Sequence, residues 1–112
     1  MNDKTVAVLG GGSWGTVLAN LAAERGFNTT LWMRDNEIVD QVNLEKQNSK
    51  YLPGYILSDN LLATNEIEAI SSSDLVIFCI PSDSFRDIAQ KAVPHIKLTS
   101  HLVTATKGVE ED

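Results

Sequence analysis

The stretch Gly10-Gly11-Gly12-Ser13-Trp14-Gly15 separates an apolar run from a helical pattern and decides the fold. Residues 5–9 before it predict a short strand, which three consecutive glycines bring to an end. After it, apolar residues recur at the spacing of one helix face: Trp14, Val17, Leu18, Leu21 and Ala22. We therefore expect a strand, a glycine-rich turn and a helix in direct succession, with this apolar stripe typical of the face that packs on a sheet.

The three glycines of a G-x-G-x-x-G pattern have separate tasks in a turn that binds a dinucleotide. Gly10 permits the tight turn out of the strand, Gly12 lets the backbone approach a pyrophosphate, and Gly15 allows the helix to lie close to the strand. The N-terminus of the helix then favours negative charge through its free N–H groups and its dipole. The pattern alone is weak because glycine loops also form plain structural turns, but its place between strand and helix predicts a pyrophosphate-binding turn.

Short apolar runs alternate with helical patterns along the rest of the chain, which is typical of a parallel α/β sheet. The predicted strands are residues 5–9, 28–33, 61–64, 74–80 and 102–105. The fourth is apolar from Leu75 to Ile80 and suits a strand that is buried on both faces. With right-handed crossovers, the sequence predicts a doubly wound parallel α/β sheet (the Rossmann fold) with strands in the order 3-2-1-4-5.

Capping residues and prolines mark the expected helix boundaries. Asp35 predicts the N-cap of a second helix that ends near Lys46. Asn65, with Glu68 three residues later, resembles a capping pair for a short helix. Pro94 is expected to close a further helix. The apolar stripe of that helix comprises Phe85, Ile88, Ala89, Ala92 and Val93.

Ser13 and Trp14 fill the gap between the second and third glycines of the pattern. Ser13 could offer its N–H and hydroxyl to a phosphate or could cap the helix, and we expect both roles. The side chain of Trp14 lies on the apolar stripe and could belong to the core, while its backbone N–H could still face the ligand.

The end of the second predicted strand is where the adenosine ribose of a dinucleotide lies. An acidic residue at this point would accept hydrogen bonds from the 2′-OH and favour NAD, but position 34 is arginine. Arg34 could pair with a 2′-phosphate, which predicts that NADP is accepted; the alternative is a solvated surface arginine. Asp35 beside it could still serve a 2′-OH. NADP and NAD are therefore both expected cofactors, and the preference between them stays open.

Composition argues against several classes of function. The 112 residues are the size of one domain, and their formal net charge of −6 argues against nucleic acid as a partner, which needs a basic face. No apolar run approaches the ~18 residues of a membrane span, so we expect a cytoplasmic protein without a membrane partner. The single cysteine, Cys79, cannot form an internal disulfide, and no metal-ligand spacing occurs, so no metal site is expected.

Five segments, which together span nearly the whole chain, carry a resemblance to one enzyme family. They are Gly10-Gly11-Gly12-Ser13-Trp14-Gly15-Thr16, Leu31-Trp32-Met33-Arg34, Asn48 through Tyr51-Leu52-Pro53-Gly54, Ile80-Pro81-Ser82 and Ala105-Thr106-Lys107-Gly108-Val109-Glu110. In this order they resemble the opening of bacterial NAD(P)-dependent glycerol-3-phosphate dehydrogenase. The Tyr-Leu-Pro-Gly and Ala-Thr-Lys-Gly segments are fairly specific, because other dinucleotide folds rarely have both.

The resemblance implies hydride transfer between NAD(P)H and dihydroxyacetone phosphate, which gives sn-glycerol 3-phosphate for glycerophospholipid synthesis. The residues that it implies as cofactor contacts are Ser13, Trp14, Arg34 and Lys107, together with Tyr51 near the adenosine end. Lys107 would also contact the phosphorylated substrate, and it follows the last predicted strand at its carboxyl end, where ligands of open α/β sheets gather. Phe85 resembles an aromatic residue of the cofactor pocket, although its place on a helix stripe suits a core role equally.

Members of the family are much longer, and their second, helical domain supplies the general-base lysine. The resemblance therefore implies that residues 1–112 are a truncated NAD(P)-binding domain, with no catalytic residue and no activity alone, from an enzyme that is a homodimer at full length. Two alternatives stay open. One is another Rossmann dehydrogenase of the hydroxyacid type, against which segments 51–54 and 105–108 argue, and the other is a non-catalytic dinucleotide-binding module.

Overall fold

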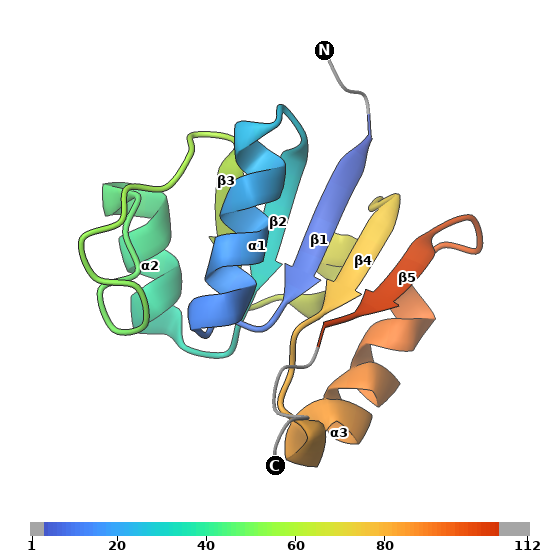
Figure 1. The fold of residues 1–112 in the computed structure, drawn as a ribbon. Coiled ribbons are helices and arrows are strands. Elements are labelled where there is room, and N and C mark those ends of the chain that lie inside the picture. Colours follow the sequence, from blue (N-terminus) through green and yellow to red (C-terminus); the bar gives the residue numbers. More distant parts are fainter. Residues whose placement is uncertain (1–3, 106–112) are drawn as a thin grey trace.

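The computed structural model describes residues 4–105, in which strands and helices alternate along the chain (Figure 1). The strands are β1 (Thr5–Leu9), β2 (Asn28–Trp32), β3 (Leu61–Thr64), β4 (Leu75–Phe78) and β5 (His101–Thr104). The helices are α1 (Ser13–Glu24), α2 (Asn36–Glu45) and α3 (Ser82–Ala92), with 3-10 turns η1 (Ile67–Ile70) and η2 (Val93–His95). Every predicted strand is present, with ends that lie within two residues of the predicted ones.

The five strands form one parallel sheet in the order β3-β2-β1-β4-β5, which confirms the predicted topology. From β1 the chain moves outward to β2 and β3, then returns to the other side of β1 to form β4 and β5. The carboxyl ends of the strands therefore meet at one edge of the sheet (Figure 1). Ligands of doubly wound sheets bind at this edge, at the point between β1 and β4 where the strand order reverses.

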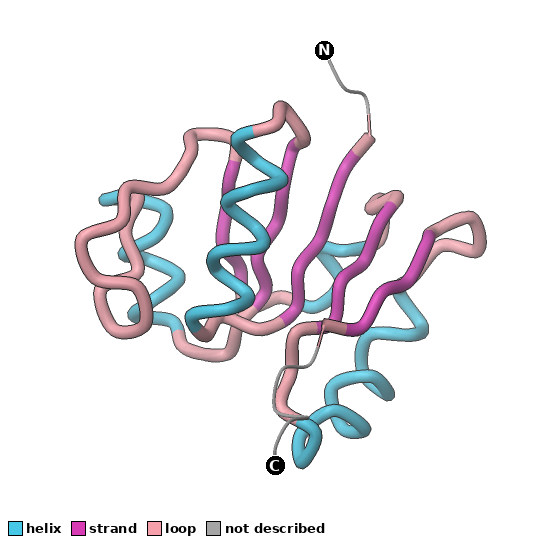
Figure 2. Tube along the Cα trace, viewed as in Figure 1, coloured by secondary structure: helices cyan, strands magenta, loops and turns pink. Residues whose placement is uncertain are grey.

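Helices cover both faces of the sheet, with α1 and α2 on one face and α3 with η1 on the other (Figure 2). Beneath α1 and α2 the core contains Val6, Val8, Leu31, Ile38, Val42 and Leu61. On the face of α3 it contains Ala7, Leu9, Ile70, Val76, Phe78, Ile88 and Ala92. Neighbouring residues of β1 alternate between the two cores, which is the geometry of a strand buried on both faces.

Helix α1 packs on the sheet through small and polar residues, so the predicted apolar stripe is wrong as its buried face. The buried residues are Gly15, Thr16, Ala19, Asn20 and Ala23. Trp14 and Leu21 of the predicted stripe are 45% and 43% exposed. The reason is the close approach of α1 to the strands, because a Cβ added to Gly15 would lie 1.9 Å from the carbonyl oxygen of Gly10.

Strand β4 is less buried than its apolar sequence predicts. Val76 and Phe78 are buried against α3, whereas Leu75 and Ile77 on the opposite face are only partly buried. The difference follows from the position of α1, which packs against β1 and β2. The prediction of burial on both faces is therefore correct for one face of β4 and too strong for the other.

Two expected helix boundaries differ in the structure. Asn65 does not cap the short helix, since η1 has Glu66 at its N-cap and Asn65 donates a hydrogen bond to the side chain of Asn36. Pro94 lies inside the 3-10 turn η2, which continues directly from α3, and Val93 is 57% exposed there. Local capping and stripe patterns do not predict boundaries of this kind, because contacts with other elements decide them.

The long loop between α2 and β3 lies along α1, where amide side chains hold it. The backbone N–H of Ser58 donates to Oδ1 of Asn20, a buried residue of α1, at 2.7 Å. Nδ2 of Asn60 donates to the carbonyl oxygen of Ala23 at 3.1 Å. These bonds fix the end of the loop that leads into β3. The end that follows α2 is thereby directed toward the glycine-rich turn.

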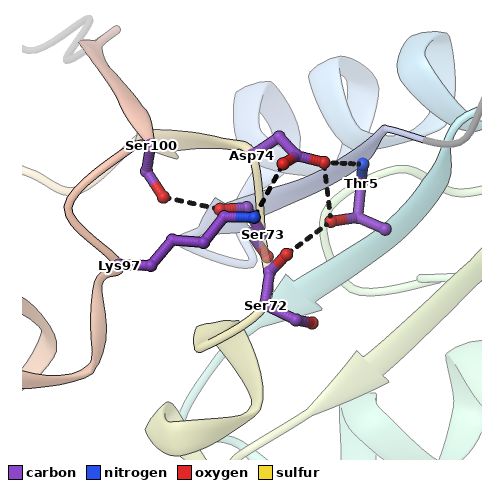
Figure 3. Close-up of polar contacts among 6 residues, drawn as sticks. All are labelled: Thr5, Ser72, Ser73, Asp74, Lys97 and Ser100. Carbon is purple, nitrogen blue, oxygen red and sulfur yellow. Dashed lines mark hydrogen bonds and ion pairs between the residues drawn. The ribbon is translucent and has the colours of Figure 1, made fainter.

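At the amino edge of the sheet, Asp74 joins three segments that are distant in sequence (Figure 3). Its Oδ2 accepts the backbone N–H of Thr5 at 2.8 Å, and its Oδ1 accepts Nζ of Lys97 at 2.8 Å. The hydroxyl of Ser100 donates to the carbonyl oxygen of Ser73 beside it. The hydrogen bond from Lys97, followed by that from Thr5, holds the pKa of Asp74 below its ordinary value of 3.8. The cluster closes the edge opposite the carboxyl ends of the strands, so we assign it a structural role.

The lowered pKa of Asp74 predicts a stability that depends on pH. A carboxylate with a lowered folded-state pKa stabilises the fold above its unfolded pKa, and this contribution is lost as pH falls through the folded value. Asp74→Asn should therefore be less stable than the parent at pH 7, and the difference should shrink as pH falls below about 4. Urea unfolding across pH would measure it, with exposed Asp59→Asn as the control. An equal difference at pH 7 and pH 2.5 would contradict the assignment.

Candidate functional site

The glycine-rich turn lies at the carboxyl ends of β1, β2 and β4. Gly10 has φ +124°, and a Cβ there would lie 2.1 Å from the carbonyl oxygen of Cys79. Its N–H donates to the carbonyl oxygen of Trp32 at 2.8 Å. Position 10 thus requires glycine both for its backbone conformation and for its contact with the residue that follows β4.

The N-terminus of α1 is open toward the same edge. Gly12 is its N-cap residue and supplies no side-chain cap, and no acidic residue lies in the first turn. A Cβ added to Gly12 would meet no atom of the described residues within 4 Å. The first-turn N–H groups, which have no partner within a helix, can therefore receive the oxygens of an anionic ligand. This is the environment that a pyrophosphate needs, so the residues present fit a dinucleotide.

Two clefts meet at the glycine-rich turn. The first, of about 230 Å³, lies toward β2 and α3 and is lined by residues that include Met33, Arg34, Asp35, Ser84 and Ile88. The second lies toward Trp14, Gly15 and Cys79. Both are also lined by Gly10–Gly12, Tyr51, Ile80 and Pro81. An elongated ligand could cross the turn with one end in each cleft, which is how a dinucleotide lies across this edge of a doubly wound sheet.

A buried asparagine links the Tyr51 loop to the glycine-rich turn. Asn48 is fully buried, and its Nδ2 donates to the carbonyl oxygen of Gly11 at 3.0 Å and to Oγ1 of Thr16 at 2.9 Å. Its Oδ1 accepts the backbone N–H of Tyr51 at 3.3 Å. Tyr51 is consequently held where it borders both clefts.

Ser13 takes part in the same link through its side chain. Its hydroxyl donates to the carbonyl oxygen of Tyr51 at 2.7 Å. The helix is capped by Gly12, so the predicted capping role of Ser13 is wrong. With its hydroxyl proton committed to Tyr51, Ser13 has its backbone N–H to offer to a phosphate.

Arg34 and Asp35 leave β2 at the wall of the first cleft. The prediction that Asp35 caps α2 is confirmed, because its Oδ1 accepts the N–H groups of Glu37 and Ile38. The guanidinium of Arg34 lies 3.3 Å from Oδ2 of Asp87 on α3, and both side chains are 61% exposed. Arg34 is thus near the end of β2, as the sequence predicts, but it already has a carboxylate partner.

The other predicted cofactor contacts differ in their positions. Trp14 borders the second cleft with a side chain that is 45% exposed. Phe85 packs against Phe78, with ring centroids 5.5 Å apart, and is not among the described residues that line either cleft, which favours its core role. Lys107 lies outside the described residues.

Sequence reasoning did not assign a role to Asn48 or Asp87. Asn48 begins a segment that carries the family resemblance, and only that resemblance singles it out, since its partners Gly11 and Thr16 are more than thirty positions away. Asp87 is an exposed carboxylate on the polar side of α3, and no local pattern distinguishes it from other surface charges.

Burial raises the pKa of the Cys79 thiol, so this thiol keeps its proton at neutral pH.

Two negative findings concern the described residues, 4–105. Among them, no group of three or more His, Cys, Asp or Glu side chains could hold a metal ion. None of the helices within this range is long and apolar enough to cross a membrane.

Comparison with known proteins agrees with this geometry. Residues 5–112 match the family described as the N-terminus of NAD-dependent glycerol-3-phosphate dehydrogenase. The chain belongs to this family. The match favours the glycerol-3-phosphate dehydrogenase interpretation over another dehydrogenase of the hydroxyacid type.

Individual relatives are bacterial enzymes named glycerol-3-phosphate dehydrogenase [NAD(P)+]. The chain is 44% identical to that of Carboxydothermus hydrogenoformans over 112 residues, which cover 99% of this chain and 33% of the relative. It is 45% identical to that of Saccharophagus degradans, with all of this chain and 32% of the relative covered. The chain therefore spans about a third of the length of the curated relatives that it matches.

Solved structures show the same fold. The glycerol-3-phosphate dehydrogenase of Coxiella burnetii superposes with a TM-score of 0.86 at 31% identity, over 94% of this chain and 33% of that one. The enzyme of Saccharomyces cerevisiae gives a TM-score of 0.87 at 27% identity, over 96% of this chain and 34% of that one.

The Asn48 link yields a prediction for stability. Asn48→Ala leaves the N–H of Tyr51 without its side-chain partner and the carbonyl oxygen of Gly11 with the longer bond from Oγ1 of Thr16, so unfolding free energy should fall by about 1–3 kcal/mol. Amide hydrogen exchange should quicken in the Tyr51 loop more than in β1. Ser49→Ala, which removes an exposed bond to Gln41, serves as the control. Unchanged stability and exchange in Asn48→Ala would show that the link is not needed.

Proposed function

We propose that this chain binds the nicotinamide dinucleotide of a glycerol-3-phosphate dehydrogenase, with NADP or NAD lying across the two clefts. The observation that carries the proposal is the open N-terminus of α1 at Gly12, between the clefts. The names of its relatives, which are NAD(P)+ enzymes, support the choice of dinucleotide.

The residues of this chain bind and orient the cofactor. The first-turn N–H groups of α1, from Ser13 onward, hold the pyrophosphate. Arg34 pairs with a 2′-phosphate at the adenosine end, and Tyr51 covers the turn between the two ends. Trp14 borders the opposite cleft, toward the nicotinamide. The bound cofactor supplies or accepts the hydride, so this part of the protein contributes position rather than acid–base chemistry.

The substrate and the setting follow from the family. The proposed reaction is hydride transfer between NAD(P)H and dihydroxyacetone phosphate, giving sn-glycerol 3-phosphate for glycerophospholipid synthesis. By resemblance, Lys107 contacts cofactor and substrate, and the general base lies in a helical domain beyond residues 1–112. The resemblance also supports a cytoplasmic homodimer for the full-length enzyme. The net charge of −6 argues against nucleic acid as the partner, whereas local N–H groups can still hold a small phosphorylated substrate.

Gly12→Ala tests the proposed role of the turn. The added methyl group meets no described protein atom, and the backbone of Gly12 (φ −74°, ψ −171°) suits alanine. Stability should be unchanged or up to about 1 kcal/mol higher. The methyl group would keep the pyrophosphate from the N–H groups, so calorimetry should show NADPH and NADH binding at least about tenfold weaker.

Gly15→Ala provides the contrast, because its Cβ would lie 1.9 Å from the Gly10 carbonyl oxygen and should lower stability itself. If Gly12→Ala binds both dinucleotides as tightly as the parent, the proposed site is wrong.

Arg34→Ala tests the adenosine end. Loss of a charge-assisted bond to the 2′-phosphate should weaken NADPH binding by roughly five- to tenfold. NADH, which has a 2′-OH instead, should lose less than about twofold. Parallel titrations with the two cofactors measure the difference, and equal losses would rule out a role for Arg34 in binding the 2′-phosphate.

A further inference from the structure

The carboxylate of Asp87 pairs with Arg34, the cation that would bind the 2′-phosphate of the proposed cofactor. Arg34 leaves the end of β2, Asp87 lies in the middle of α3, and their Nη2 and Oδ2 atoms are 3.3 Å apart. Ser84 and Ile88, which flank Asp87 on α3, line the same cleft as Arg34. The ion pair therefore connects two walls of the first cleft.

We propose that Asp87 is a specificity-determining residue that restrains Arg34 and thereby limits the preference for NADP over NAD. This inference rests on the proposed function, in which Arg34 receives the 2′-phosphate. The ratio of NADP affinity to NAD affinity would thus depend on a residue of α3, outside the glycine-rich turn.

The restraint acts through competition for one guanidinium. The planar fork of arginine pairs with one carboxylate or one phosphate group at a time along a given edge. A 2′-phosphate at the end of β2 competes with Asp87 for Arg34. NAD carries no such phosphate and meets no such competition, so Asp87 disfavours NADP selectively.

The strength of the restraint follows from its exposure. Both side chains are 61% exposed, and exposed ion pairs are weak because water and salt screen them. Asp87 is further shared with Lys91, whose Nζ lies 3.7 Å away one helical turn along α3. A bound phosphate can therefore displace Asp87, so the expected effect is a change of ratio rather than exclusion of NADP.

Asp35 does not provide an equivalent restraint. Its Oδ1 is engaged by the first N–H groups of α2, where it acts as the N-cap. Its carboxylate is thus fixed by the helix, whereas that of Asp87, in the middle of α3, is held by its two cationic neighbours. Asp87 can consequently be replaced without loss of a cap.

The test compares NADPH and NADH binding to Asp87→Asn by calorimetry at low ionic strength. NADPH should bind about two- to five-fold more tightly than to the parent, while the dissociation constant for NADH changes by less than about 1.5-fold. In the Arg34→Ala background, Asp87→Asn should give no such gain, because the effect passes through Arg34. Asp83→Asn removes the same charge from the first turn of α3 and is the matched control.

The outcomes separate the inference from the function on which it rests. Tight binding of both cofactors with an unchanged NADPH-to-NADH ratio in Asp87→Asn overturns the inference alone. So does an equal gain in the Arg34→Ala background or in Asp83→Asn, which would assign the gain to general charge. A parent chain that binds neither dinucleotide overturns the proposed function and the inference together.

Discussion

The close packing of the glycine-rich turn, against the end of β4 at Gly10 and against α1 at Gly15, is the constraint on which the rest of the structure depends. At Gly10 and Gly15 the backbones approach so closely that no side chain fits between them. Close approach directs small residues such as Ala19 and Ala23 to the sheet and leaves Trp14 at the surface beside a cleft. It also points the N-terminus of α1 at the edge where the strand order reverses. One packing requirement therefore fixes both the position of the helix and the place where an anion can bind.

A second layer of the site is built from polar side chains rather than from the sheet. The loop between α2 and β3 buries Leu57 in the core, and hydrogen bonds that involve the amide side chains of Asn20, Asn48 and Asn60 hold it along α1. Such bonds are strongly directional, and a buried amide without a partner is costly, so the loop has one preferred position. That position puts Tyr51 over the turn. The amino edge, closed by Asp74, is independent of these contacts and supports the fold from the opposite side.

Features that depend on local sequence pattern could be predicted, whereas features that depend on contacts between distant segments could not. Strand positions and order follow from alternation, glycines and handedness, and the structure confirms them. The buried face of α1 was mispredicted because a hydrophobic stripe ignores how near the helix lies to the sheet. Asn65 was mispredicted as a cap because its side chain has a partner on another element, Asn36. The turn and Arg34 were visible in the sequence, whereas the pairing of Arg34 with Asp87, 53 positions away, was not.

We propose that the open N-terminus of α1 receives the pyrophosphate of a dinucleotide. The most direct measurement is the change in backbone amide resonances of the isotope-labelled chain on titration with NADPH. We expect the largest shifts at the N–H groups from Gly12 to Gly15, smaller ones at Arg34 and Tyr51, and none at Asp74. Shifts centred on the amino edge of the sheet, or saturation without change at residues 12–15, would contradict it.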